Sequence, residues 1–453
     1  MYTPEKSEKQ YSFGEGWFFP PELDQEHFLI KLSHTLPWEE LSEHLAQYYC
    51  PDNGRPTKPA RVKIGLLIVK HLYQFSDDDA LDMLKRDVYV QYLCDISFSQ
   101  AKNFMNVSTL CRFRQDIGDH GMKLIEDAVL KTLGKKRKRR VRTLITDTTV
   151  VSSNIAYPTD VTLLEKTRCQ AVKLLAKAKT FGAGPVRTYK RIARKVFVMY
   201  QKIRKHTVKS RRRTQKRLRQ FAARNIQQLH DAVIKIKRAT AQPMDKACQT
   251  FIDATDMFLS TAHKIIEQQK KIYHKQKVKE RIVSLHRPDI RPMVRGKYPV
   301  EVEFGPKILL NSQGDLLTLE RLDFENTADS RLFQDSLNGY KQRFGRFPCE
   351  VTADRGFWSK ENQSLAESLG IKKIAIENKG KSSHLKGKSF RERLRRKRCR
   401  IEAKISLAKR KYGLDRCRYT RVGSEIIWTR LGLLVMNLKT AYDTGQLAIK
   451  ISV

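Results

Sequence analysis

Cysteine is scarce and scattered in this sequence. The 453 residues include eight cysteines, and no two of them form a C-x-x-C pair. A zinc knuckle needs paired thiolates of that kind, and a small disulfide-stabilised domain needs a denser cysteine framework. The pattern therefore excludes both classes and predicts reduced cysteines in an intracellular protein.

Long apolar runs are also absent. No stretch approaches the roughly 20 apolar residues that a membrane-spanning helix requires, and no acylation motif is present. The N-terminal segment mixes charges and prolines and lacks the apolar region of a signal peptide. We therefore expect no membrane partner and a cytoplasmic location. A length of 453 residues with 40% hydrophobic composition is nevertheless enough for two or three domains with apolar cores.

Acidic residues are few relative to basic ones. The 48 Asp and Glu residues face 89 Lys and Arg residues, which gives a formal net charge of +41. Such a charge opposes compaction by self-repulsion unless a polyanion neutralises it. Nucleic acid is the polyanion that this composition predicts, because each neutralised phosphate releases a counterion.

The lack of acids is complete between Lys166 and His230, where 65 consecutive residues contain 21 Lys or Arg and no Asp or Glu. Within 187–219, apolar residues recur at near-helical spacing, which predicts one long amphipathic helix. A solvated helix normally pairs opposite charges four residues apart, and this one cannot. We interpret 161–285 as a basic helical insertion that lies along nucleic acid. Its proposed phosphate contacts are Arg211, Arg212 and Arg213, and a solvated charged face is the alternative.

The first 134 residues are predicted to be helical. The segment 97–118 is compatible with a helix-turn-helix in which Arg112 and Arg114 point outward and meet DNA. A plain helical bundle with a solvated arginine face fits this segment equally well. The run "KKRKRR" (135–140) follows, and we interpret it as a phosphate-contacting linker in preference to a solvated charge run.

Three carboxylates stand out after this linker. Asp147 lies at the centre of the apolar β-type run "TLITDTTVV", where an unpaired charge is costly. Asp354 ends a predicted strand in "VTADRGFW". Glu402 shares one helix face with Arg398 and Lys409. For Glu402, an ordinary salt-bridged surface position is the alternative interpretation.

The predicted elements place these acids on one mixed α/β framework. A strand carries Asp147. It is followed by a β-hairpin, a helix, a strand that ends at Asp354, a second helix, another strand and a helix with Glu402. Carboxylate oxygens on a sheet and an adjoining helix are the ligands that Mg²⁺ prefers. Two such ions can activate a water or a 3′-hydroxyl and stabilise the leaving oxygen. The pattern therefore predicts a site for two Mg²⁺ ions, with Mn²⁺ able to substitute.

This order of elements resembles the RNase H-like core of DDE transposases, and more closely that of insertion-sequence transposases of the IS-four/IS-five superfamily. The resemblance is carried by "TDTTVVSSNIAYPTDVTLL", "SLHRPDIRPMVRGKYPVEVEFGPK", "TADRGFW" and the helix around Glu402. That superfamily marks its third acid with Tyr-x2-Arg-x3-Glu-x6-Lys. Arg398, Glu402 and Lys409 match this motif, whereas Arg395 stands where the tyrosine is expected. The N-terminal helices, including "STLCRFRQDIG", resemble the InsH-type N-terminal domain.

The resemblance implies a transposase that binds the terminal inverted repeats of its insertion sequence and catalyses metal-dependent DNA cleavage and strand transfer. Asp147, Asp354 and Glu402 would be the catalytic metal ligands, and Arg398 and Lys409 would bind phosphate. The implied partners are double-stranded DNA, as inverted repeats and as target, and a second copy of the chain in a homodimeric synaptic complex. The implied location is the prokaryotic cytoplasm, in association with the nucleoid. A structure-specific nuclease without strand transfer and a catalytically silent DNA-binding protein are alternatives on the same fold.

The expected domain organisation has four parts, because the insertion interrupts the core after its first strand. Asp147 and Asp354 are 207 positions apart, whereas Asp354 and Glu402 are 48 positions apart. The parts are a helical N-terminal DNA-binding domain (1–134), the basic hinge with the first strand (135–160), the basic helical insertion (161–285) and the remainder of the RNase H-like core (286–453).

Overall fold

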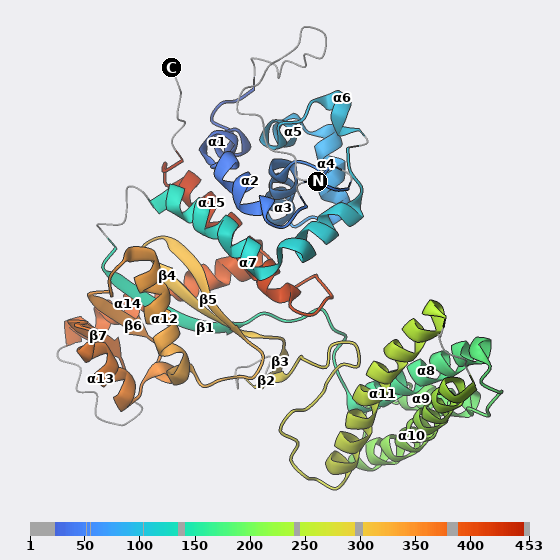
Figure 1. Cartoon of the computed structure of the whole chain (residues 1–453). Coiled ribbons are helices and arrows are strands. Elements are labelled where there is room, and N and C mark those ends of the chain that lie inside the picture. The colour runs from blue at the N-terminus through green and yellow to red at the C-terminus, as the bar shows by residue number, and fades with distance from the viewer. Residues whose placement is uncertain are drawn as a thin grey trace. The chain divides into compact units, whose positions relative to one another are not determined.

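The chain divides into two compact units (Figure 1). The first unit combines Met1–Asn154 with Pro306–Val453, and the second covers Ile155–Gly305. The computed structural model describes residues 23–447 apart from 51, 55, 103, 135–140, 240–244, 295–301 and 378–387, and gives only the backbone of 99, 134 and 388–395. The predicted basic hinge, 135–140, thus lies outside the described residues. Within the described ranges, no helix combines the length and the apolar character that crossing a bilayer requires.

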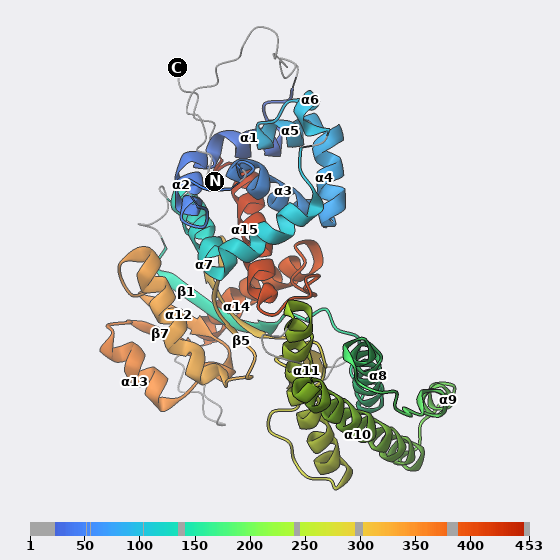
Figure 2. The same ribbon diagram turned by 45° about the vertical axis from the view of Figure 1, so that its right-hand side comes forward.

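The N-terminal part of the first unit is helical, as predicted. Its helices are α1 (Phe28–Thr35), α2 (Trp38–Ala46), α3 (Ala60–Tyr73), α4 (Asp77–Arg86), α5 (Val88–Cys94), α6 (Phe98–Ala101) and α7 (Val107–Gly134). The start of α4 is fixed by a capping box, because the Ser76 hydroxyl and the Asp79 carboxylate each accept a hydrogen bond from the other's backbone N–H. The apolar helix α15 (Ser424–Asp443) packs against α3 and α7 and also against the sheet strand β5 (Leu316–Asp323), so it joins the helical part to the sheet (Figure 2).

The outward orientation predicted for Arg114 is wrong. Its side chain is buried, donates hydrogen bonds of 2.9 and 2.6 Å to the carboxylate of Asp77, and lies over the ring of Tyr419. A buried guanidinium is tolerated only with such a partner, so Arg114 holds α7 against α4 and is not available to DNA. Arg112, two positions earlier, is exposed. The helix α7 is kinked at Gly118, where the backbone adopts φ 54° and ψ −155°.

The sheet of the first unit has five strands in the order β5-β4-β1-β6-β7. β1 (Thr143–Val150) pairs antiparallel with β4 (Lys307–Gln313), which pairs antiparallel with β5. On its other side, β1 pairs in parallel with β6 (Glu350–Ala353), which pairs in parallel with β7 (Lys373–Ile376). Thr146 lies opposite Ala353 in this register. The residues that follow them, Asp147 and Asp354, therefore come to neighbouring positions despite their distance in sequence.

Helices pack on both faces of this sheet, and alternate residues of β1 point to opposite faces. Thr146 faces α12 (Asp329–Phe344), where its hydroxyl lies 2.6 Å from that of Ser336. Thr143 faces α14 (Lys388–Lys411), where its hydroxyl lies 3.5 Å from Nζ of Lys397. Asp147 shares the face of Thr143 and so points to the side of α14. With η2 (Arg355–Phe357) and α13 (Lys360–Ser368) between β6 and β7, the predicted order of elements and the mixed α/β class are confirmed.

The second unit has its own helical core. Its elements are α8 (Asp160–Ala178), η1 (Lys179–Phe181), α9 (Lys190–Gln201), α10 (Val208–Ala239), α11 (Lys246–Tyr273) and a short ribbon of β2 (Pro292–Val294) and β3 (Val302–Phe304). Leu164, Ala222, Leu229 and Ala262 are fully buried between the helices. The basic stretch thus folds around an apolar interior, and most of its cations lie at the surface.

The single long helix predicted for 187–219 is wrong. The helical conformation ends at Gln201 and resumes at Val208. The hydroxyl of Thr207 accepts a hydrogen bond of 3.1 Å from a backbone N–H in the first turn of α10, which is the geometry of a helix N-cap. Three cations within the short connection, Lys202, Arg204 and Lys205, also oppose a continuous helix by mutual repulsion. The second unit, Ile155–Gly305, extends beyond both ends of the predicted insertion, 161–285.

Candidate active site

Asp147 lies in the middle of β1 with a half-buried carboxylate. Its Oδ1 accepts a hydrogen bond of 2.8 Å from the backbone N–H of Thr148. Burial raises the pKa of Asp147 from its ordinary 3.8 to about 6. The negative charges of Asp354 and Glu402 raise this pKa further, whereas the Thr148 N–H and the Arg398 guanidinium lower it. The three predicted acids and Arg398 therefore act on one another electrostatically.

Asp354 follows the last residue of β6 and caps the short helix η2. Its Oδ1 accepts a hydrogen bond of 2.7 Å from the backbone N–H of Arg355. The same oxygen lies 2.7 Å from Nη2 of Arg398. The side chain of Asp354 remains 47% exposed, so the carboxylate is accessible to a ligand from solvent.

Glu402 approaches from α14, one turn after Arg398 on the same helix face. Its Oε1 lies 3.7 Å from Nη2 of Arg398, and its side chain is 57% exposed. One guanidinium thus bridges a carboxylate from the end of β6 and a carboxylate from α14. Because it also lowers the pKa of Asp147, Arg398 offsets the mutual repulsion of all three acids.

The oxygen ligands of Asp147, Asp354 and Glu402 are of the type that Mg²⁺ or Mn²⁺ prefers. Among the described residues, no three His, Cys, Asp or Glu side chains are grouped closely enough to hold a metal ion as they stand. The cation that lies among these acids is the Arg398 guanidinium. The donor chemistry fits a divalent ion, since an added positive charge would relieve the repulsion that helps to raise the pKa of Asp147.

A further carboxylate, Asp329, supports the site and was not found by sequence reasoning. It begins α12 and accepts hydrogen bonds from the Thr148 hydroxyl at 3.1 Å and from the Lys307 ammonium at 3.2 Å. A Cβ atom on Gly356 would lie 2.7 Å from its Oδ2, so glycine allows the loop after Asp354 to approach α12. An aspartate in the first turn of a helix is an ordinary partner of the helix dipole, so the sequence contains no signal that singles it out.

The remaining predicted phosphate contacts lie on separate elements. Lys409 is half-buried near the end of α14, and Arg112 is exposed on α7. The exposed arginines at the start of α10 are Arg211, Arg212 and Arg213. Of these, Arg212 donates a hydrogen bond of 2.9 Å to the backbone carbonyl of Tyr273. The side chain of Arg395, which stands in place of the expected tyrosine, lies outside the described part of the chain.

The arrangement as a whole suits metal-assisted phosphoryl transfer. Two aspartates come from adjacent parallel strands, a glutamate comes from a helix packed on the same face, and an arginine connects them. Carboxylates placed in this way can hold divalent ions, and the arginine can bind a phosphate oxygen.

Comparisons with known proteins agree with this chemistry. Residues 20–116 match the family described as "Transposase domain (DUF772)", and residues 306–438 match the family described as "Transposase DDE domain". These two matches support a DDE transposase. DDE transposases act on DNA and generally use divalent metal ions.

Among curated proteins, "Uncharacterized protein ORF8 in nfe locus" of Rhizobium meliloti is 31% identical to this chain over 175 residues. The aligned part is 38% of this chain and 82% of the relative. No solved structure matches the chain. The DDE match begins just before β4 and includes Asp354 and Glu402, whereas Asp147 precedes it because the second unit separates β1 from the rest of the sheet.

Proposed function

We propose that this transposase binds the terminal inverted repeats of its own insertion sequence and catalyses metal-dependent strand cleavage followed by strand transfer. The observation that supports the proposal most strongly is the gathering of Asp147, Asp354 and Glu402 around Arg398. The strand order and the position of these acids are compatible with the RNase H-like core that a DDE domain implies.

In this proposal Asp147, Asp354 and Glu402 would hold two Mg²⁺ ions, for which Mn²⁺ could substitute. Bound there, the ions would supply activation of a water or a 3′-hydroxyl and stabilisation of the leaving oxygen. The carboxylates act as ligands and not as nucleophiles, so no covalent intermediate with the protein is needed. Asp147 binds a cation only when ionised, and with a pKa of about 6 most of it is ionised at pH 7 and above.

Arg398 has a different role before and after DNA binds. Without DNA, its guanidinium neutralises Asp354 and Glu402. A phosphate at the site competes for the same guanidinium, whose fork matches two phosphate oxygens. Movement of Arg398 from carboxylate to phosphate leaves both acids free for divalent ions. DNA binding and metal binding therefore favour each other, and Lys409 adds a second positive charge for the phosphate.

DNA is held by cations that lie outside the carboxylate site. Arg112 on α7 contacts the repeat, and Arg211, Arg212 and Arg213 on α10 bind the phosphate backbone together with the basic hinge 135–140. The net charge of +41 favours this association and makes it sensitive to salt. Because two ends of the element must be joined, a homodimer acts in the synaptic complex, and the reaction takes place on DNA of the prokaryotic nucleoid.

The test is cleavage of labelled DNA that carries the element's own terminal repeat, in the presence of Mg²⁺. The native chain is compared with Asp147→Asn, Asp354→Asn and Glu402→Gln, each of which removes one negative charge and keeps the size of the side chain. The matched control is Asp335→Asn, which removes a partly exposed carboxylate of α12 that pairs with Arg321 of β5. We expect loss of cleavage and strand transfer in the three variants, full activity in the control, and repeat binding in all of them.

Two alternatives give different results in the same assay. A structure-specific nuclease depends on the same acids but cuts DNA with and without the repeat equally. A catalytically silent DNA-binding protein binds the repeat and never cuts, and the three variants then behave like the native chain.

A further inference from the structure

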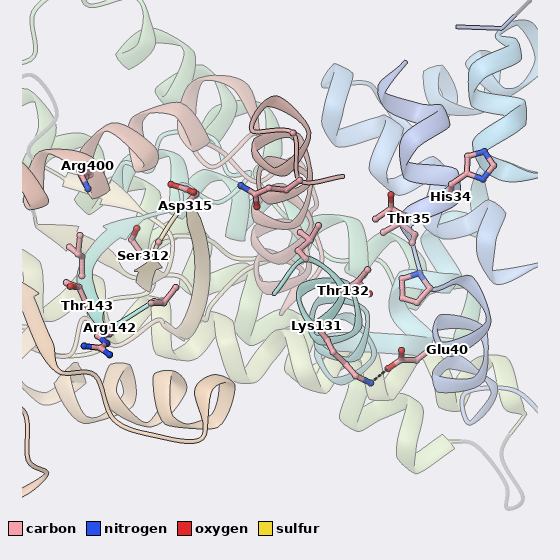
Figure 3. A pocket seen from close by; sticks show the side chains of 18 of the residues that line it. His34, Thr35, Glu40, Lys131, Thr132, Arg142, Thr143, Ser312, Asp315 and Arg400 are labelled. Carbon is pink, nitrogen blue, oxygen red and sulfur yellow. Dashed lines mark hydrogen bonds and ion pairs between the residues drawn. The ribbon is translucent and has the colours of Figure 1, made fainter. Parts of the chain in front are cut away.

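The first unit contains a large groove that none of the three acids lines. Its volume is about 1050 Å³. It lies between α1 and α2, the end of α7, the start of β1, the turn from β4 to β5, and α14 (Figure 3). The walls come from the N-terminal helices and from the sheet, so the groove runs along the junction of the two transposase domains.

Positive charge is in excess along this groove, because four Lys and Arg residues line it together with only two acidic residues, Glu40 and Asp315. Lys131 and Lys397 line it, but each has a carboxylate partner: Lys131 bonds to Glu40 at 3.0 Å, and Lys397 to Glu350 at 2.6 Å. Arg142 and Arg400 line it as well and are exposed. In the described part of the chain, neither of these two arginines forms an ion pair. Figure 3 shows them at the same end of the groove, opposite Lys131 and Glu40.

The helix α14 separates this groove from the carboxylate site. One face of the helix carries Arg398 and Glu402, which lie beside Asp354. Another face carries Lys397 and Arg400 into the groove. A strand whose phosphates follow the second face therefore passes within one helix diameter, about 10–12 Å, of the reacting carboxylates.

The size and the lining of the groove select its ligand. A sphere with the volume of this groove, 1050 Å³, is about 13 Å across. The major groove of B-DNA alone is about 12 Å wide, and the whole duplex is wider than its major groove, so the duplex does not fit inside. The floor includes apolar side chains, namely Leu36, Pro37, Leu133 and Ile145. An unpaired strand combines the two properties that such a lining recognises, because its phosphates are anionic and its bases present apolar faces.

We propose that this groove binds an unpaired DNA strand next to the active site, with Arg142 and Arg400 on its phosphates and its bases against the apolar floor. This inference rests on the proposed function, because strand cleavage supplies the unpaired DNA. It adds a second DNA-binding site, which binds an unpaired strand and not a duplex. The duplex is held by the cations named above, whereas the groove takes the strand that cleavage leaves unpaired.

The test is equilibrium binding of the full chain, without metal, to a short fluorescent oligo(dT) and to a short duplex of mixed sequence at several salt concentrations. The groove variant is Arg142→Gln with Arg400→Gln. The matched control is Arg86→Gln with Arg331→Gln, which removes the same charge from exposed positions of the same unit outside the groove lining. Each phosphate contact on a single strand contributes about 0.7 to the slope of log affinity against log salt. We expect the groove variant to lower the oligo(dT) slope by about 1.4 and its affinity by about tenfold, with duplex binding unchanged.

Amine acetylation locates the strand independently. Lys131 has a side chain that is 62% exposed, and Lys85, on α4 and outside the groove lining, has one that is 46% exposed. Oligo(dT) should slow the acetylation of Lys131 and leave that of Lys85 unchanged, as read by mass spectrometry of tryptic peptides.

Each other outcome overturns the inference in a distinguishable way. Equal losses in the groove variant and the control mean that only net charge matters. A native chain that binds and cuts its repeat but does not bind oligo(dT) refutes the groove and leaves the transposase proposal intact. A native chain that binds neither DNA refutes both proposals.

Discussion

Replacement of Asp147 by asparagine should stabilise the metal-free protein while it abolishes catalysis. The pKa of Asp147 is about 6 in the folded chain and 3.8 in its ordinary state. At about 1.4 kcal/mol per pH unit, this difference corresponds to a cost of up to about 3 kcal/mol for keeping the carboxylate ionised in the folded chain. Asparagine carries no charge, and its side-chain oxygen still accepts the hydrogen bond from the Thr148 N–H.

The pH dependence has a defined sign. Because the folded chain holds the proton on Asp147 more tightly than the unfolded chain, ionisation of this group lowers stability. The cost is absent below about pH 4, grows between about pH 4 and 6, and is complete above about pH 6. The difference in melting temperature between the asparagine variant and the native chain should therefore be largest at pH 8 and should vanish at pH 4.

The magnitude follows from the size of the first unit, which has about 300 residues. An unfolding entropy of about 2.1 cal/mol/K per residue gives about 0.6 kcal/mol/K, so 3 kcal/mol corresponds to a rise of up to about 5 °C. Differential scanning calorimetry with EDTA measures this shift, with Asp335→Asn as the control. Added Mg²⁺ should raise the melting temperature of the native chain and not that of Asp147→Asn. A metal-free variant that melts at or below the native temperature at pH 8 would refute the argument from burial.

Four further variants test other parts of the structure. Arg114→Ala removes two hydrogen bonds to the Asp77 carboxylate, which keeps Lys70 as an ion-pair partner, and should cost about 1.5–3 kcal/mol in urea unfolding, whereas Arg112→Ala should change stability by less than about 0.5 kcal/mol and weaken repeat binding. Gly356→Ala places a Cβ atom 2.7 Å from an Asp329 oxygen and should slow cleavage without weakening DNA binding, as measured in the cleavage assay and by fluorescence anisotropy. Conversion of the three arginines at 211–213 to glutamine should lower the salt slope of duplex binding by up to about 2.7, at about 0.9 per phosphate contact.

The parts of the fold that were predicted correctly depend on local patterns. The β-type run around Asp147 and the predicted β-hairpin, whose turn is "NSQGD" (311–315), can be recognised because strand alternation and turn residues act over a few positions. Gly314 in that turn adopts φ 66°, a conformation that glycine reaches without steric cost. The order of strands and helices followed from such signals, and the acids could be placed because each stands at a recognisable point of one element.

The parts that were missed depend on contacts between distant segments. The burial of Arg114 depends on its ion pair with Asp77, which is 37 positions away. The sequence of the helix alone does not show whether its arginine face contacts solvent or a carboxylate of another helix. The groove likewise has walls from 34–40 and 397–400 that only the folded chain brings together. Helix periodicity relates Arg398 only to Glu402 on the same helix, so it could not predict the ion pair between Arg398 and Asp354.

The point in the chain at which the second unit is inserted explains how so large a segment can lie between two paired strands of the sheet. The chain leaves β1 at Val150 and returns at Lys307, and these two residues are paired neighbours in the antiparallel register. The backbone N–H of Val151 still bonds to the carbonyl of Pro306 at 3.1 Å. The ends of the intervening segment thus meet as in a hairpin, and the unit between them has its own buried core.

A variant in which a short Gly-Ser linker replaces 155–305 should therefore fold. The sheet register does not depend on the removed residues, and closing a shorter loop costs less entropy. We expect circular dichroism and calorimetry to show a cooperative first unit that retains oligo(dT) binding through Arg142 and Arg400. Duplex affinity and its salt slope should both fall, because 21 cations between Lys166 and His230 are lost. A variant that fails to fold would show that the sheet needs the second unit, and unchanged duplex binding would show that its positive charge serves another purpose.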